Sequence, residues 1–217
     1  MIRALAGLAL ALPVATPVAA ASADQATEQA TDQATESTVH ATKTVDVASL
    51  VERAQAGEAR AFAVLYQRFA RAVHAVALAK LAAADAHDVV QDVFAQAHQQ
   101  LGELREPAAF PGWIMTLARR RAIDAQRLEI SRRRRHDGEP ASQATAPHPA
   151  LALDAHRALT AIRALPESYA EILLMRLVED LDGYEIAERT GLTPGSVRVT
   201  LHRGMTMLRA ALQGGEP

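Results

Sequence analysis

The residues that could carry chemistry in this chain are arginines rather than metal ligands or nucleophiles. The 217 residues include no cysteine, which excludes disulfides, thiolate zinc sites and a cysteine nucleophile. Eight histidines are present, but none falls in a metal-ligand spacing such as His-Glu-x-x-His. A glycine-rich phosphate loop and a Gly-x-Ser-x-Gly elbow are also missing. We therefore predict no catalytic residue, no metal and no cofactor, and the chain is not expected to be an enzyme.

Positive charge is concentrated in one segment. The formal net charge is -2, yet residues 113–135 carry eight arginines against two acidic residues. Such a cluster attracts the phosphates of nucleic acids. The sequence before and after it is acidic on balance, so the chain as a whole is a poor binder of free polyanions. If it acts on DNA, we expect it to act with a partner.

A second pattern, near the carboxyl end, is typical of a helix-turn-helix. Ala187 is small enough to let two helices approach, Gly191 suits a sharp helix exit, and Val197 would pack the second helix on the first. Thr193 and Pro194 suit the N-cap and first position of that second helix. Its outward residues, which would face DNA, are predicted to be Ser196, Arg198, Val199, His202 and Arg203. A plain helical hairpin with a solvated arginine face is the alternative for this pattern alone.

The elements that must position these residues are predicted to be helices. Aromatic residues make up only 4% of the chain, and apolar residues recur at intervals of three and four from Asp46 onward. Asp85 is predicted to cap one helix at its amino end. In that helix the row Val89, Val93 and Ala97 would face inward, which leaves Asp88, Gln91 and Asp92 on the outside.

Composition divides the chain into four parts. Residues 1–45, an apolar stretch followed by DQAT, EQAT and DQAT repeats, are predicted to be a disordered extension. Residues 46–135 form a first helical domain. Residues 136–150, with three prolines and no periodicity, form a flexible linker. Residues 151–217 form a second domain that contains the helix-turn-helix. We predict an all-α fold of two small helical domains.

Four segments, in order, resemble bacterial RNA polymerase sigma factors of the extracytoplasmic-function group. GEARAFAVLYQRFARAVHAVA, DAHDVVQDVFAQAH and FPGWIMTLARRRAIDAQR resemble the family's region two, and ALPESYAEILLMRLVEDLDGYEIAERTGLTPGSVRVTLHRGMTMLR resembles its region four. The resemblance covers about Val47 to Leu212. It implies a promoter-recognition subunit that binds core RNA polymerase and promoter DNA and takes no small-molecule substrate. It adds an anti-sigma factor as a candidate partner.

The resemblance also implies roles for individual residues. Asp88, Gln91 and Asp92 match the face that docks on the β′ clamp, and the β flap is a second contact on the polymerase. The loop LREPAAFPG matches the loop that takes up a flipped base of the minus-ten element. The minus-ten contacts would be Phe110, Trp113, Arg119, Arg120, Arg121 and Arg127. The minus-thirty-five contacts would be the outward residues of the helix-turn-helix, namely Ser196, Arg198, Val199, His202 and Arg203.

Two other functions are compatible with the sequence, and the amino end resembles a segment that would not belong to a DNA-binding protein. The main alternative is a stand-alone helix-turn-helix regulator that binds duplex DNA without polymerase, and the other is a structural or secreted helical protein. The apolar run Ala4 to Leu12 and the Ala-Ser-Ala ending at Ala23 look like a secretory signal peptide. A start codon placed too early, a non-functional extension and a membrane tether each explain this stretch. We favour the first, with a cytoplasmic protein and a valine start at Val39 or Val45.

Overall fold

Helices make up the elements of the computed structural model, which describes residues 46–135 and 149–213. The first range holds α3 (Val47–Gln55), α4 (Ala59–Leu78), α5 (Ala83–Gln100), the short 3-10 helices η2 (Leu101–Glu103) and η3 (Pro107–Ala109), and α6 (Phe110–Arg135). The second range holds α7 (Pro149–Arg163), α8 (Glu167–Leu177), α9 (Gly183–Thr190) and α10 (Pro194–Gln213). The predicted all-α fold is confirmed for this part of the chain. The predicted extension and most of the predicted linker lie outside it.

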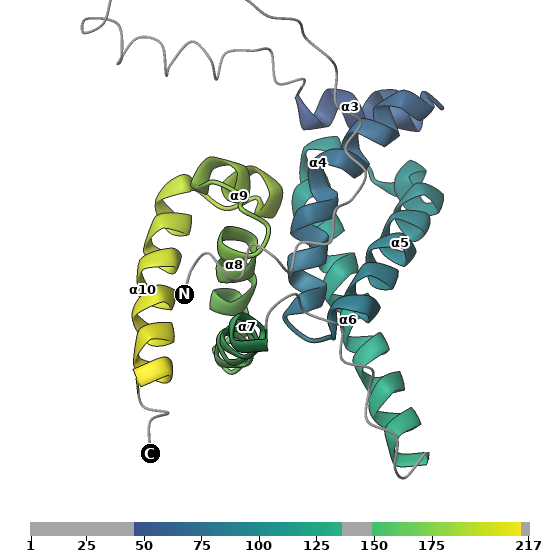
Figure 1. Cartoon of the computed structure of the whole chain (residues 1–217). Coiled ribbons are helices and arrows are strands. Elements are labelled where there is room, and N and C mark those ends of the chain that lie inside the picture. Colours follow the sequence, from purple (N-terminus) through teal and green to yellow (C-terminus); the bar gives the residue numbers. More distant parts are fainter. Residues whose placement is uncertain (1–45, 136–148, 214–217) are drawn as a thin grey trace, which may run out of the picture. The chain divides into compact units, whose positions relative to one another are not determined.

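The first set of helices, α3 to α6, is built around α4 (Figure 1). Leu65, Phe69, Val73 and Val76 of α4 have no exposed surface, as their helical spacing predicted. The ring of Phe69 meets that of Phe110 edge to face, with centroids 5.1 Å apart. The predicted inward row of α5 is also buried. This core holds α5 and the amino-terminal half of α6 at fixed positions.

Single residues mark the ends of two helices in this set. Gly57, two residues beyond the end of α3, has a φ of +90°, in the left-handed region that glycine adopts without a Cβ clash. The prediction that Asp85 caps α5 is wrong. The helix begins at Ala83 with Ala82 as its N-cap, and the Asp85 carboxylate lies inside the first turn. In that position the negative charge still interacts favourably with the positive amino end of the helix dipole.

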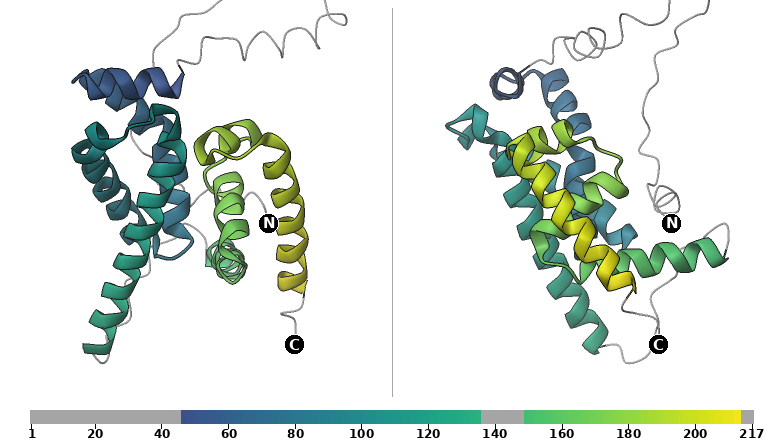
Figure 2. Two further views of the ribbon diagram at one scale, coloured as in Figure 1. Left: turned by 180° about the vertical axis from the view of Figure 1, so that it is seen from behind. Right: turned by 90° about the vertical axis from the view of Figure 1, so that its left-hand side faces the viewer.

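The second set of helices, α7 to α10, encloses a separate group of buried apolar side chains. The largest are Ile162, Leu173, Leu174, Met175 and Leu181. α10 packs along α8 at Gly204, where an added Cβ would lie 3.2 Å from Leu173 Cδ1. α9 precedes α10 and joins it through a tight turn (Figure 2).

The two sets of helices also contact each other. α4 packs against α8 and α9, and α6 packs against α9. The described helices therefore belong to one compact unit. The division into domains at 46–135 and 151–217 stays a prediction. α7 begins at Pro149, inside the predicted linker.

Candidate nucleic-acid interface

The helix-turn-helix is built by local hydrogen bonds that its sequence specifies. At the start of α9, Glu185 N donates to Asp182 Oδ1 (2.7 Å), and Asp182 N donates to Glu185 Oε2 (2.9 Å), which makes a capping box. Gly191 ends α9 with φ +74°. Thr193 Oγ1 then accepts from Ser196 N at 3.1 Å, so the predicted cap of α10 is confirmed. The turn is thereby fixed on both sides.

The outward face of α10 is solvent-exposed as the pattern predicted. Val197 has no exposed surface and Ala187 is 5% exposed, so both are buried while α9 and α10 pack against each other. The residues predicted to face DNA are all exposed: Ser196, Arg198, Val199, His202 and Arg203. Two arginines, an imidazole, a hydroxyl and a methyl-bearing side chain are groups that can read base edges and phosphates in a major groove.

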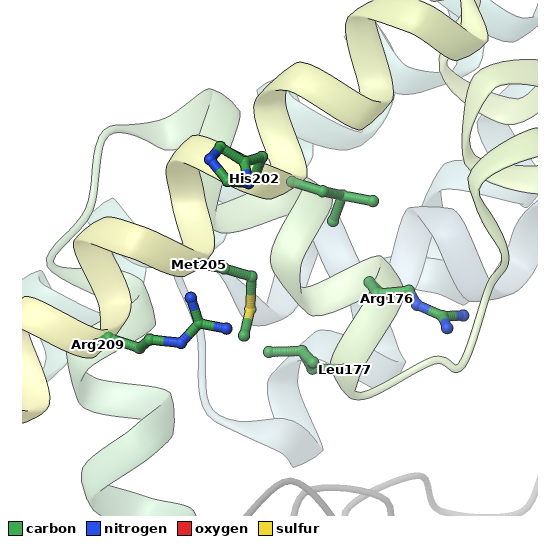
Figure 3. A pocket seen from close by; sticks show the side chains of 6 residues that line it. Arg176, Leu177, His202, Met205 and Arg209 are labelled. Carbon is green, nitrogen blue, oxygen red and sulfur yellow. The ribbon is translucent and has the colours of Figure 1, made fainter.

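An apolar groove lies beside this face, between α8 and α10 (Figure 3). Its volume is about 420 Å³, and it is lined by Arg176, Leu177, Leu201, His202, Met205 and Arg209. Leu201 is half-buried and lines the groove. Sequence reasoning did not find this groove, because its residues come from two helices whose packing no spacing reveals.

The predicted minus-ten residues lie in three different settings. Phe110 has no exposed surface, because α6 begins there with the ring inserted against Phe69. Its ring therefore lies in the core of this structure, and its minus-ten DNA contact stays a prediction. Trp113 is half-buried against Phe110, with ring centroids 5.7 Å apart. Arg120 and Arg127 are exposed on α6.

Arg119 and Arg121, the other two arginines predicted to contact minus-ten DNA, each hydrogen-bond to a side chain of another helix. Arg121 Nε donates to Gln96 Oε1 of α5 at 2.9 Å. Arg119 holds Glu171 of α8 with a two-pronged contact, Nε to Oε1 at 2.9 Å and Nη2 to Oε2 at 2.8 Å. The hydrogen bond to Glu171 raises the pKa of Arg119 above its ordinary value. A guanidinium in this geometry binds carboxylates and phosphates alike.

The loop before α6 is supported by a residue that sequence reasoning missed. Gln55 Nε2, at the end of α3, donates to the carbonyl oxygens of Leu101 and Leu104, both at 2.8 Å. These bonds tie residues 101–104, at the start of the predicted minus-ten loop, to α3. An amide at the last position of a helix is too common to have signalled this role.

The predicted polymerase-binding face is presented on α5. Asp88, Gln91 and Asp92 are all exposed, while Val89 and Val93 of the same helix are buried. The face thus carries two carboxylates and an amide on adjacent turns. In the described ranges no cluster of three or more His, Asp or Glu could hold a metal ion. Within the same ranges, no helix combines the length and apolarity that crossing a membrane requires.

The fold and these faces define a class of helical DNA-binding proteins, with a helix-turn-helix and a separate arginine-rich helix. Two family models match the chain: Sigma-70 region 2 over residues 65–136 and Sigma-70, region 4 over residues 155–208. CarQ of Myxococcus xanthus, an RNA polymerase sigma factor, is 30% identical over 171 residues, covering 75% of this chain and 95% of CarQ. SigV of Bacillus subtilis is 32% identical over 130 residues, covering 59% and 76%. The chain belongs to the RNA polymerase sigma factor family, in its extracytoplasmic-function group.

Other relatives are longer than the matched region. The chain covers 42% of the probable sigma factor RfaY of Xanthomonas campestris, at 33% identity, and 64% of BldN of Streptomyces coelicolor, at 27% identity, which match 73% and 75% of this chain. The solved structure of CnrH in complex with the cytosolic domain of CnrY has a similar fold, with TM-score 0.52 and 22% identity over 79% of this chain and 99% of that chain. A match to region 2 as well as region 4 speaks against the stand-alone helix-turn-helix regulator.

Proposed function

We propose that this protein binds core RNA polymerase, directs it to promoters with a minus-ten and a minus-thirty-five element, and assists DNA melting. The observation that carries the proposal is the presence, in one sigma-family chain, of an exposed helix-turn-helix face and an arginine-rich helix. The protein itself supplies recognition and no catalytic step. A cytoplasmic location follows from the proposed partners, polymerase and chromosomal DNA.

The core polymerase contact is assigned to the exposed face of Asp88, Gln91 and Asp92, which would dock on the β′ clamp. Exposed carboxylates beside an amide can pair with arginines of a partner. The β flap is proposed as a second polymerase contact, and an anti-sigma factor as a further partner.

The DNA contacts are divided between the two sets of helices. Trp113, together with Arg119, Arg120, Arg121 and Arg127, would hold the opened minus-ten strand, with the arginines on its phosphates. The exposed face of α10, from Ser196 to Arg203, would read the minus-thirty-five element in the major groove. Val199 is 50% exposed, so it can contact a thymine methyl group.

The first test of this proposal is charge reversal at the docking face. Because Asp88 and Asp92 are exposed, Asp88→Lys/Asp92→Lys should change the free energy of unfolding by no more than about 0.5 kcal/mol per site. Losing charge pairs that become buried in an interface should weaken binding by about 2–5 kcal/mol. We expect the variant to keep its melting temperature and to lose its complex with purified core polymerase on gel filtration.

The matched control is Glu52→Lys/Glu106→Lys, which reverses two exposed carboxylates away from α5. It should bind core polymerase like the unmodified chain. Equal binding by both variants would show that α5 is not the docking face. No complex with the unmodified chain would refute the proposed function itself.

A further inference from the structure

Arg121 of α6 is held on one side by a side chain of α5. Its Nε donates to Gln96 Oε1 at 2.9 Å, across the contact between the two helices. Gln96 is in turn held by Gln100, since its Nε2 donates to Gln100 Oε1 at 3.3 Å. Because the amide nitrogen of Gln96 faces Gln100, its oxygen is the atom that faces Arg121. The three side chains therefore form one series of hydrogen bonds with a single direction.

This hydrogen bond uses only the inner donor of the Arg121 guanidinium. A guanidinium carries five N–H donors, one on Nε and four on the two Nη atoms. Within residues 46–135 and 149–213, no atom accepts a hydrogen bond from either Nη atom of Arg121. Arg121 is half-buried, so it keeps part of its surface in solvent. Two Nη donors match two oxygens of a phosphate, and Arg121 therefore offers a two-donor end whose orientation Gln96 sets.

Arg121 lies beside the face of α6 that we assign to minus-ten DNA. Trp113, Arg120 and Arg127 recur at intervals of seven residues, close to two helical turns, so they share one face of α6. Arg121 follows Arg120 by one residue and is bonded to α5, so it borders this face on the α5 side. At the other end of the hydrogen-bond series, Gln100 is the last residue of α5. The series therefore starts directly before the predicted minus-ten loop.

We propose that Gln96 is a positioning residue for minus-ten DNA: it holds Arg121 so that the two Nη groups clamp one phosphate of the opened strand. The inference rests on the proposed function, in which Arg121 contacts that strand. A flexible arginine loses conformational freedom when it binds, and this loss opposes binding. Gln96 restricts the Arg121 side chain before DNA arrives, so less freedom remains to be lost. The contact is therefore stronger with Gln96 than without it.

The experiment uses holoenzyme, formed from the full chain and purified core polymerase, and DNA that this holoenzyme selects from a random-sequence pool. In the minus-ten strand, one phosphate at a time is replaced by an uncharged methylphosphonate, and the dissociation constant is measured. Gln96→Met removes the acceptor but keeps the length and helix propensity of the side chain. Arg121→Met removes the guanidinium and so identifies the phosphate that it contacts. The control, Gln67→Met, makes the same change at an exposed amide of α4.

For the unmodified chain, we expect methylphosphonate at the phosphate that Arg121 contacts to weaken binding by roughly tenfold. This loss should disappear in Arg121→Met, fall to about threefold in Gln96→Met and stay unchanged in the control. Losses at the other phosphates should be the same in every variant. Because each loss is a ratio within one protein, differences in overall stability cancel.

A methylphosphonate profile in Gln96→Met that equals that of the control would overturn the proposal, and so would a profile lowered equally at every phosphate. Either result would leave Gln96 as a link between α5 and α6 only. The absence of any phosphate whose effect depends on Arg121 would also overturn it. The proposed function fails separately, if the unmodified chain forms no complex with core polymerase or the complex selects no DNA sequence.

Discussion

Removing the cap of α9 should weaken the helix-turn-helix by an amount that its geometry sets. Asp182→Ala deletes the acceptor of the 2.7 Å bond from Glu185 N and removes a negative charge from the start of a helix. A lost N-cap costs about 1 kcal/mol and a lost charge–dipole contact about 0.3–1 kcal/mol. The expected loss of unfolding free energy is therefore about 1–2 kcal/mol. Because α9 has only eight residues, it cannot compensate through its own length.

Asp182→Asn separates the two contributions. The amide oxygen of asparagine still accepts the hydrogen bond, so only the charge contribution should be lost. For a chain of this size, about 1 kcal/mol lowers the melting temperature by about 2–4 °C. We expect circular dichroism to show a fall of about 2–8 °C for the alanine variant and a smaller fall for the asparagine variant. Equal melting temperatures for the alanine variant and the unmodified chain would refute the assigned role of the cap.

Three further predictions concern other parts of the interface. Gly191→Ala should lower the free energy of unfolding, measured with denaturant, by about 1–2 kcal/mol, because a residue with a Cβ is strained at φ +74°. An unchanged unfolding midpoint would count against the assigned turn. Arg198→Ala/Arg203→Ala should weaken promoter discrimination in run-off transcription while core binding is retained; an equal loss on all templates would indicate phosphate contact alone. Gln55→Ala should lower the free energy of unfolding by about 0.5–1.5 kcal/mol and speed hydrogen exchange in residues 101–109. Unchanged exchange would show that the two Gln55 hydrogen bonds do not hold this loop.

The helix-turn-helix was predictable because its signals are local. A glycine at the end of α9, a threonine cap and a proline at the first position of α10 act within a few residues of one another. The exposed and buried faces of α5 followed from helical periodicity in the same way. Such features depend little on the rest of the fold.

Features that join distant segments were not predictable. The burial of Phe110 depends on Phe69, on another helix, and periodicity alone could not distinguish it from an exposed loop residue. Leu128 of α6 is 48% exposed although it is apolar, and its residue type alone does not reveal this. The pairs of Arg119 with Glu171 and Arg68 with Glu188 span 52 and 120 residues. Residue spacing carries no information on contacts at that range.

The central claim, that this protein directs core polymerase to promoters, is tested most directly by footprinting. Purified chain and bacterial core RNA polymerase are each incubated with genomic DNA fragments, alone and together, and protected sequences are read out. We predict protection by the mixture only, at sites that share two elements at a constant spacing, with an opened strand at the element nearer the start site. Protection of the same sites by the chain alone, or none by the mixture, would contradict it.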